Sequence, residues 1–249
     1  MRRALLLVPV LIAGCGGTAE PPVVAEQRPP VATAAPSVER SPSLQAPVTA
    51  ARGRWTTARL QGRAALRAAP GGRAVGAVGP RTQFGGPRVV SVLERRGKWL
   101  QVIVPERPNA RPAWISGVRA RLGFTDLALY VDRSARTLTV REGDRTVQRV
   151  RIGVGAPGHP TPTGRFAVTD KLAMGGPGTT YGCCAIALSA HQPDLPTTWN
   201  GLDRIAVHGT QSPATIGAAA SLGCMHASEP DLRRLMRTVP LGAPVFIRA

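Results

Sequence analysis

A cysteine and a histidine stand close together near the C-terminal end of the 249-residue chain, Cys224 in "ASLGCMHASEPDL" and His208 in "IAVHGT". A thiol becomes an effective nucleophile when an imidazole within hydrogen-bond reach accepts its proton. The preceding glycine, Gly223, lets backbone N–H groups approach a developing oxyanion, and a backbone carbonyl can fix the tautomer of the imidazole. The pair therefore predicts nucleophilic catalysis by Cys224, with a thiol pKa lowered by His208.

The other cysteines and histidines allow different roles. A lone cysteine is most often a buried small residue. Zinc would find enough ligands once Cys183, Cys184 and His191 are included, but the chain has no Cys-x-x-Cys pair and no His-x-x-x-His pair, so neither a metal nor a cofactor is predicted. Cys183 and Cys184 could pair with each other and leave Cys224 free, or both stay unpaired, because a disulfide between neighbours closes a small strained ring.

The elements that position these residues are mostly short strands. The segment 122–249 contains "LALYVDRSARTLTVREGDRTVQRVRIGVG", which alternates apolar and polar residues around turn signals at "DRSAR" and "REGDR". His208 ends an apolar strand, and Cys224 comes shortly before a helix that Ser228 caps, with Asp231 at the capping-box spacing. The helix N-terminus is expected to stabilise the thiolate. The fold class is therefore mostly β, with one main helix in this domain and a final strand in "GAPVFIRA".

Residues 55–121 form a second predicted domain of short strands. "RVVSVLERRGKWLQVIV" predicts two strands around an "RRGK" turn. "KWLQVIVP" and "PAWIS", preceded by "ALRAAPGG", together resemble a bacterial SH3-like domain, a small β-barrel common in cell-wall proteins. In that interpretation Trp99, Trp114 and Ile115 are core residues.

The N-terminus carries an export signal. Residues 1–15 combine a basic "MRR", a short apolar "ALLLVPVLI" and "IAGC", which resembles the lipobox of bacterial lipoproteins and ends at Cys15. The apolar run is too short to span a bilayer. The resemblance predicts an exported, extracytoplasmic lipoprotein, anchored to the cell envelope by a lipid on Cys15, and the alternative is a plain signal peptide. Residues 16–54 are a Pro/Ala-rich linker.

The net charge of +18 is concentrated in one part of the chain. Residues 52–121 carry fifteen Lys and Arg against two acids, a balance of +13. Nucleic acid is the usual partner of so basic a segment, but an exported lipoprotein rarely meets it, so no nucleic acid is predicted. Anionic envelope polymers and lipid headgroups are the expected partners. The alternative explanation of the positive charge is GC-rich coding, because thirty of the thirty-two basic residues are Arg.

The motif around the cysteine resembles that of a known enzyme family. "VHGT", "IG" and "ASLGCMHASEPDL" are similar to the signature of the L,D-transpeptidase (YkuD) family, in which His-Gly-Thr is followed by Ser-His-Gly-Cys-Ile/Val-Arg. "HPTPTGRF" and "YGCCAIALSAH" also resemble family segments, and the likeness covers roughly residues 124–249.

The resemblance implies a role for each matching residue. Cys224 is the nucleophile, His208 the general base, and the Gly209 carbonyl orients the imidazole. The N–H groups of Gly223 and Cys224 form the oxyanion hole. The residues implied to support the site or contact the substrate are Ser221, Thr210, His226, Tyr181 and His191.

The implied reaction is acyl transfer on peptidoglycan stem peptides. The Cys224 thiolate attacks the L,D peptide bond between a diamino acid and the terminal D-Ala of a tetrapeptide, D-Ala leaves, and a thioester remains. The side-chain amine of a neighbouring stem then forms a 3→3 cross-link. If water resolves the thioester, the same site is an L,D-carboxypeptidase.

Two residues depart from the signature. Leu222 stands where the family usually has His or another polar residue, and His226 stands where it usually has Arg. A guanidinium binds a carboxylate bidentately and an imidazole cannot, so the anchoring of the substrate differs. These departures motivate the alternative of a catalytically degenerate wall-binding lipoprotein. A second family of wall cysteine hydrolases, NlpC/P60, places the cysteine before its histidines, and the chain order here disfavours it.

Overall fold

The computed structural model describes residues 53–195 and 202–249. The predicted leader with Cys15 and nearly all of the predicted linker lie outside the described residues. The predicted fold class is confirmed as mostly β, and the described residues contain one α-helix, α1 (Glu229–Thr238). In that same part of the chain no helix is both long and apolar enough to cross a membrane.

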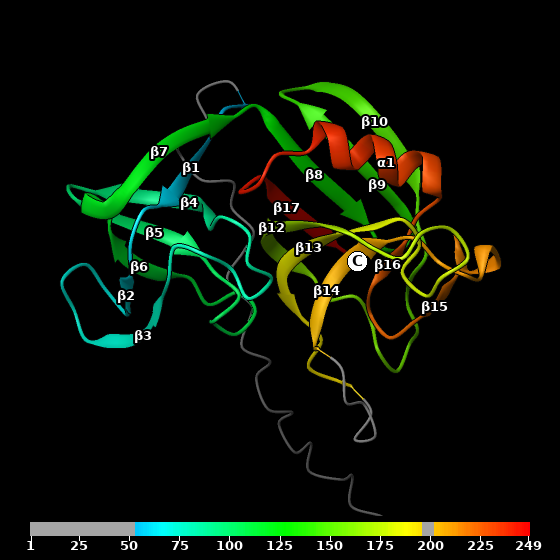
Figure 1. Cartoon of the computed structure of the whole chain (residues 1–249), viewed down its shortest axis with the longest axis horizontal. Helices are drawn as coiled ribbons and strands as arrows, with labels where there is room; N and C mark the ends of the chain where they lie inside the picture. The colour runs from blue at the N-terminus through cyan, green and yellow to red at the C-terminus, as the bar shows by residue number, and fades with distance from the viewer. Residues whose placement is uncertain (1–52, 196–201) are drawn as a thin grey trace, which may run out of the picture. The chain divides into compact units, whose positions relative to one another are not determined.

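The first sheet has seven strands in the order β3-β2-β6-β5-β4-β1-β7, and all its pairs are antiparallel (Figure 1). The predicted "RRGK" turn is confirmed: β4 and β5 join through Gly97 and Lys98, and Gly97 takes a positive φ of 55° that suits glycine. A 3₁₀ turn, η2 (Gly117–Arg119), precedes the last strand. The strands are β1 (Trp55–Leu60), β2 (Ala64–Arg67), β3 (Ala74–Val78), β4 (Val89–Arg96), β5 (Trp99–Ile103), β6 (Ala113–Ser116) and β7 (Ala120–Thr125).

This sheet has its own hydrophobic core, which includes Leu66, Leu100, Val102 and Ile115. Of the three predicted core residues, Trp114 and Ile115 are buried and Trp99 is half-buried. Strand β7 continues the sheet to Thr125, past the expected boundary at residue 121. The SH3-like assignment of this region stays a prediction.

The second sheet has eight strands in the order β10-β9-β8-β17-β12-β13-β14-β16, with parallel pairs β8–β17 and β14–β16. A short parallel pair, β11 (Val154–Gly155) and β15 (Ala219–Ser221), accompanies it, and a 3₁₀ turn, η3 (Pro213–Thr215), precedes β15. The eight strands are β8 (Leu127–Asp132), β9 (Thr137–Glu142), β10 (Arg145–Arg151), β12 (Gly164–Ala173), β13 (Cys184–His191), β14 (Arg204–His208), β16 (Met225–His226) and β17 (Pro244–Arg248).

Both predicted turns of this sheet are confirmed. At "DRSAR" the Asp132 carboxylate accepts hydrogen bonds from the Ser134 hydroxyl and the Ala135 N–H, both at 2.8 Å, and closes the connection between β8 and β9. At "REGDR" strands β9 and β10 join directly, with Glu142 opposite Arg145. These turns also determine the register, because a turn of fixed length sets the pairing of the strands that it joins.

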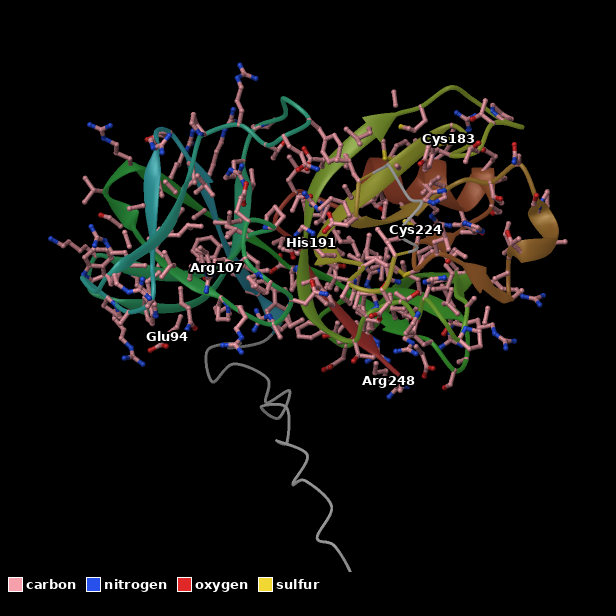
Figure 2. The ribbon with its side chains drawn as sticks, turned by 90° about the horizontal axis from the view of Figure 1, so that it is seen from below. Glu94, Arg107, Cys183, His191, Cys224 and Arg248 are labelled. Carbon is pink, nitrogen blue, oxygen red and sulfur yellow. A yellow bond between two sulfur atoms is a disulfide. The ribbon has the colours of Figure 1, made fainter. Side chains whose placement is uncertain are left out.

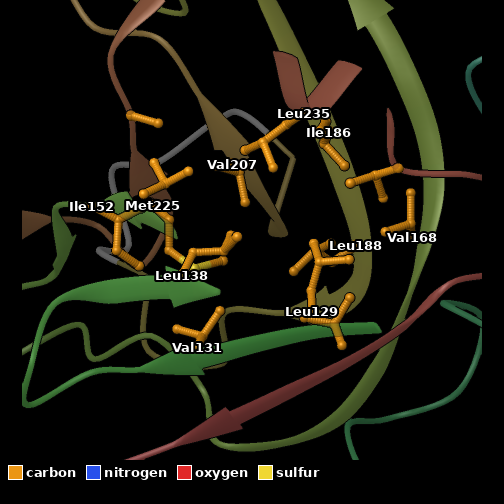
Figure 3. Packing of buried hydrophobic residues seen from close by; sticks show 14 of the residues in the cluster. Leu129, Val131, Leu138, Ile152, Val168, Ile186, Leu188, Val207, Met225 and Leu235 are labelled. Atoms are coloured by element: carbon orange, nitrogen blue, oxygen red, sulfur yellow. The ribbon is translucent and has the colours of Figure 1, made fainter. Parts of the chain in front are cut away.

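The second core lies between this sheet and α1 (Figure 3). Ser228 caps the helix by accepting a hydrogen bond from the Asp231 N–H, as the sequence predicted. Leu232 and Leu235 on one face of the helix are fully buried. The residues of the core labelled in the close view are Leu129, Val131, Leu138, Ile152, Val168, Ile186, Leu188, Val207, Met225 and Leu235.

Candidate active site

A cavity of about 530 Å³ opens on the face of β12, β13 and β14 that is turned away from the core. Alternate residues of β14 line it, namely Arg204, Ala206 and His208, as the two-residue period of a strand requires. Ala185 and Ala187 on the neighbouring β13 line it too, and register places them opposite His208 and Ala206. The small side chains of three alanines on adjacent strands therefore leave the hollow between the larger polar groups.

His208 has the geometry of a general base. Its side chain is 4% exposed, and its Nδ1 lies 2.5 Å from the Gly209 carbonyl oxygen. Since a carbonyl only accepts, Nδ1 carries the proton and Nε2 keeps its lone pair. Tyr181 packs its ring edge against the imidazole, with ring centroids 5.0 Å apart. Burial lowers the pKa of His208 more than the Gly209 carbonyl raises it, so the ring is neutral at pH 7.

Cys224 is a free thiol that lines the same cavity. Its Sγ donates to the Arg204 carbonyl at 3.7 Å, and within the described part of the chain it has no hydrogen bond to His208. Burial raises the pKa of the thiol more than the backbone of Ala206 lowers it. The prediction of a lowered thiol pKa is therefore wrong, because the loss of solvation outweighs the neighbouring groups in this structure.

A tight turn holds Cys224 in place. The Ser221 Oγ accepts a hydrogen bond from the Gly223 N–H at 3.0 Å and donates to the Cys224 carbonyl at 2.6 Å. The predicted oxyanion hole is thereby corrected, because Ser221 already occupies the Gly223 N–H. The Cys224 N–H has no hydrogen-bond partner among the described residues and remains available to an oxyanion.

Two buried side chains that the sequence did not single out anchor this turn. The Thr161 Oγ1 accepts from the Gly155 N–H at 2.9 Å and donates to the Gly223 carbonyl at 2.8 Å. The Gln192 Nε2 donates to the Pro160 and Leu222 carbonyls, both at 3.1 Å. Thr161 lies within "HPTPTGRF", whose likeness to family segments was the available signal.

Gly223 is required where it stands. Its φ of +115° lies in the region that L-residues with a side chain avoid. A Cβ at this position would also collide with the amide of Gln192. Glycine before the cysteine therefore serves the close packing of the turn, and not only the access of an oxyanion.

His226 lines the cavity beside His208, with ring centroids 5.0 Å apart. Its Nδ1 lies 2.7 Å from the Thr215 Oγ1. Burial and the nearby His208 lower the pKa of His226 to about 4, so its ring is neutral at pH 7. The position that carries an arginine in the signature therefore provides no positive charge here.

The other predicted substrate contacts divide into two groups. Tyr181, Thr210 and Ser221 line the cavity, and so does the partly exposed Leu222. His191 does not. The interpretation of His191 as a substrate contact finds no support in its position.

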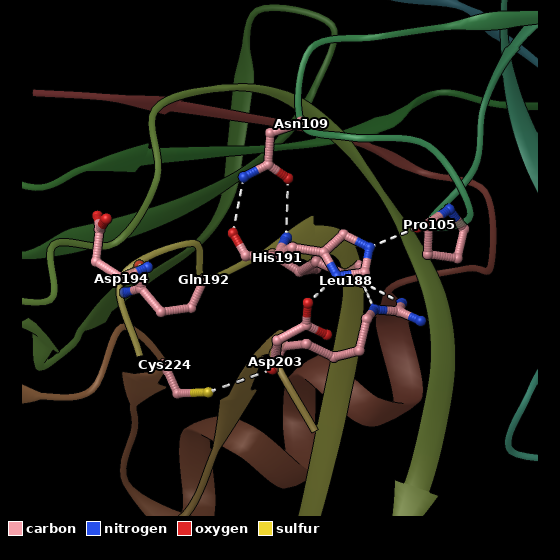
Figure 4. A network of polar contacts seen from close by, with 9 residues as sticks. Pro105, Asn109, Leu188, His191, Gln192, Asp194, Asp203 and Cys224 are labelled. Carbon is pink, nitrogen blue, oxygen red and sulfur yellow. Dashed lines mark hydrogen bonds and ion pairs between the residues drawn. The ribbon is translucent and has the colours of Figure 1, made fainter. Parts of the chain in front are cut away.

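His191 instead ties the second sheet to the loop that follows β5 (Figure 4). Its Nδ1 lies 2.8 Å from the Asp203 carboxylate and its Nε2 lies 2.5 Å from the Pro105 carbonyl. Its backbone N–H and C=O both bond to the side-chain amide of Asn109, at 2.9 and 2.7 Å. Both ring nitrogens are thus occupied, which is why the ring is not available to a ligand.

Cys183 and Cys184 form a disulfide with each other, so the pairing that the sequence left open leaves Cys224 as the free thiol. The Glu229 carboxylate accepts the Cys183 N–H at 3.0 Å and joins this loop to the start of α1. Figure 2 shows Cys183 and Cys224 on the part of the chain formed by the second sheet. The described residues include no group of three or more His, Cys, Asp or Glu side chains that could hold a metal ion.

The expectation that the N-terminus of the helix stabilises the Cys224 thiolate is also corrected. Strand β16 intervenes between the cysteine and α1, which begins at Glu229. The buried face of α1 packs against the core, and its residues are not among those that line the cavity. The helix therefore supports the sheet, and the thiol takes its surroundings from β14 and from its own turn.

Residues 126–247 match the family model YkuD, the L,D-transpeptidase catalytic domain. The match covers just under half of the chain. The YkuD proteins of Bacillus licheniformis and Bacillus subtilis are each 32% identical over 117 residues, which is 47% of this chain and 62% and 63% of theirs. The matched chain thus spans less than two thirds of the length of these relatives. Together these matches support an L,D-transpeptidase catalytic domain in the C-terminal half.

Solved structures give a weaker likeness. An L,D-transpeptidase from Mycobacterium smegmatis is 19% identical at a TM-score of 0.39, covering 65% of this chain and 90% of that one. L,D-transpeptidase 3 from Mycobacterium tuberculosis is 16% identical at a TM-score of 0.40, covering 55% of this chain and 74% of that one. At TM-scores this low the likeness supports no conclusion about this chain.

Proposed function

We propose that the chain is a peptidoglycan L,D-transpeptidase that forms 3→3 cross-links through a thioester on Cys224. One observation carries the proposal: a free thiol and a neutral imidazole whose Nδ1 is committed to the Gly209 carbonyl line one cavity. The match of residues 126–247 to the transpeptidase model supports the substrate class.

The first half-reaction transfers the donor peptide to the enzyme. The Cys224 Sγ attacks the carbonyl carbon of the L,D peptide bond while its proton passes to Nε2 of His208. The carbonyl electrons move to the oxygen, to which the Cys224 N–H can donate. When the tetrahedral intermediate collapses, the C–N bond breaks, the imidazolium returns the proton to the leaving amine, and D-Ala departs.

The second half-reaction reverses these steps with a new nucleophile. The side-chain amine of another stem attacks the thioester carbon and gives a proton to Nε2 of His208. The C–S bond breaks and Sγ regains a proton, which leaves an amide between the two stems. If water attacks instead, the product is a free tripeptide carboxylate, and the activity is that of an L,D-carboxypeptidase.

The directions of the two pKa shifts decide when the proton moves. Burial raises the pKa of the Cys224 thiol and lowers that of His208, so each favours its neutral form in the free enzyme. Transfer of the proton before the substrate binds is therefore unfavourable. We expect it to accompany the attack on the carbonyl, with the charge moving onto the oxyanion.

The remaining parts of the chain suggest where the reaction takes place. The lipobox-like "IAGC" supports export and a lipid anchor on Cys15, at the cell envelope. The balance of +13 over residues 52–121 supports contact with anionic envelope polymers. A wall-binding lipoprotein without activity is the second candidate, and the replacement of signature residues by Leu222 and His226 is the observation that favours it.

The test incubates the full chain with a tetrapeptide muropeptide. We expect release of D-Ala, and an intact-mass increase equal to the donor minus D-Ala, both lost in Cys224→Ala. Cys15→Ala is the matched control, because it removes a cysteine outside the catalytic domain and should retain both signals. If the unmodified chain releases no D-Ala and forms no thioester, the enzyme proposal is overturned and the wall-binding candidate is favoured. Mass analysis of the products separates cross-linked dimers from trimmed tripeptides.

A further inference from the structure

Arg204 opens β14 and shares the cavity face of that strand with Ala206 and His208. Its side chain is buried, with a residue exposure of 8%. Among the described residues that line the cavity, it is the one Lys or Arg. With His226 neutral at pH 7, Arg204 is therefore the positive charge available to a bound substrate.

The guanidinium is held in place but not fully used. Nε donates to the Leu188 carbonyl at 2.9 Å, and Nη2 donates to the same carbonyl and to the Thr169 Oγ1, the latter at 2.8 Å. The ring of Phe84 lies 6.0 Å from the guanidinium carbon. Within the described part of the chain Nη1 has no hydrogen-bond partner, so two N–H groups of a fixed, planar cation remain free.

No carboxylate among the described residues forms an ion pair with Arg204. Asp203 lies next to it in sequence, but its carboxylate contacts the His191 ring. The Asp170 carboxylate accepts from the Thr82 hydroxyl. Burial lowers the pKa of Arg204 more than the charges of Asp170, Glu106 and Asp203 raise it, so these carboxylates offset the lost solvation only in part. An anionic ligand in the cavity would supply the remaining counter-charge.

We propose that Arg204 binds a carboxylate of the donor peptide. It would thereby take over the role of the signature arginine, at whose position this chain has His226. This inference rests on the proposed function for the identity of the donor. A guanidinium with two free N–H groups on Nη1 suits a carboxylate, because hydrogen bonds between these charged groups are charge-assisted.

The distances fit a peptide that reaches from the thiol to the guanidinium. Sγ of Cys224 lies against the backbone of Arg204, on the β16 side of β14. The guanidinium extends the other way, across β13 to Thr169 on β12. Neighbouring strands are ~4.8 Å apart, and successive residues of the donor are ~3.8 Å apart between Cα atoms. Two strand spacings are ~9.6 Å, so a carboxylate within about two to three residues' length of the scissile bond is within reach.

A tetrapeptide stem offers three carboxylates at such distances: on the terminal D-Ala, on a diaminopimelate residue at position three, and on the isoglutamate. The test measures binding of the free-acid tetrapeptide and of three forms, each amidated at one carboxylate, to the full chain carrying Cys224→Ala. We expect one amidated form to bind about tenfold or more weakly, which identifies the carboxylate. Equal binding of all four peptides would overturn the proposal, and this arm of the test needs no substitution of Arg204.

The second arm adds Arg204→Gln to the same chain. We expect the free acid to bind as weakly as the sensitive amide, and the difference between the two to disappear. Thr169→Val is the matched control, since it removes a partner of Nη2 but keeps the guanidinium, and should keep the discrimination. If Arg204→Gln weakens all four peptides equally and still discriminates between them, Arg204 is only structural. These are binding measurements, so they remain decisive even if no D-Ala release is found and the proposed activity fails.

Discussion

Thr161→Val tests whether the turn that carries Cys224 depends on one buried hydroxyl. Thr161 is 0% exposed, and its Oγ1 bridges the Gly155 N–H at 2.9 Å and the Gly223 carbonyl at 2.8 Å. Valine has nearly the same shape but no hydroxyl. The substitution therefore leaves a donor and an acceptor without partners inside the protein and creates almost no cavity.

The size of the effect follows from these two groups. An unsatisfied buried donor or acceptor costs ~1–3 kcal/mol. Allowing some relaxation of the loop, we expect the free energy of unfolding to fall by about 2–4 kcal/mol in total. For a chain of this size each kcal/mol lowers Tm by about 2–4 °C, so the expected decrease is roughly 4–16 °C. Thioester formation should slow as well, by about 10- to 100-fold, because the turn no longer holds the Cys224 backbone in the position from which Sγ attacks.

Thermal and denaturant unfolding measure the first effect, and the rate of acylation by a tetrapeptide measures the second. Thr238→Val is the matched control, because the Thr238 Oγ1 donates to the Arg234 carbonyl at 3.0 Å where water can replace it. It should change the free energy of unfolding by less than about 0.5 kcal/mol. If Thr161→Val changes it as little as the control does, the hydroxyl is not an anchor of the turn and the reasoning fails.

Three further outcomes are expected. Gly223→Ala should lower the free energy of unfolding by about 1–3 kcal/mol and abolish acylation, because the alanine would have to adopt a φ of +115° and its Cβ would collide with the Gln192 amide. A variant that unfolds and is acylated like the wild type would contradict this. Alkylation of Cys224 in the free chain should rise only above pH 9, since burial raises the thiol pKa from 9.0, and a plateau below pH 8 would contradict it. The free energy of unfolding should fall as pH drops from 6.5 to about 4, because the unfolded chain protonates His226 first. His226→Gln should flatten that decline, and an unchanged slope would refute the shift.

Local patterns in the sequence predicted local structure well. The "RRGK", "DRSAR" and "REGDR" turns, the flanking strands and the Ser228 cap all appear where the alternation of side chains and the turn residues placed them. Each depends on residues within a few positions of one another, and short-range sterics and hydrogen bonds decide them. The pairing of His208 with the Gly209 carbonyl was implied by the family resemblance, and it too joins adjacent residues.

Features that depend on distant segments could not be predicted. Thr161 and Gln192 reach the Cys224 turn from other parts of the chain, and apart from the likeness of the Thr161 segment to the family nothing near them in the sequence indicates that role. His191 appeared to be a site residue until its partner Asn109, 82 positions away, was known. The predicted direction of the Cys224 pKa shift was wrong for the same reason, because burial is a property of the assembled sheet and outweighs the backbone hydrogen bond at Ala206.

Leu222 and His226 together change what the cavity must do to hold a substrate. A partly exposed leucine adds apolar lining, and a buried histidine with a pKa of about 4 adds no charge, so neither can select a carboxylate at neutral pH. Arg204 can, and its charge sits on the opposite side of β14 from the turn that carries the signature. A site arranged this way recognises the donor from the sheet and not from the catalytic loop. Substitutions in that loop should then impair acylation while leaving donor binding nearly intact, whereas Arg204→Gln should weaken donor binding itself.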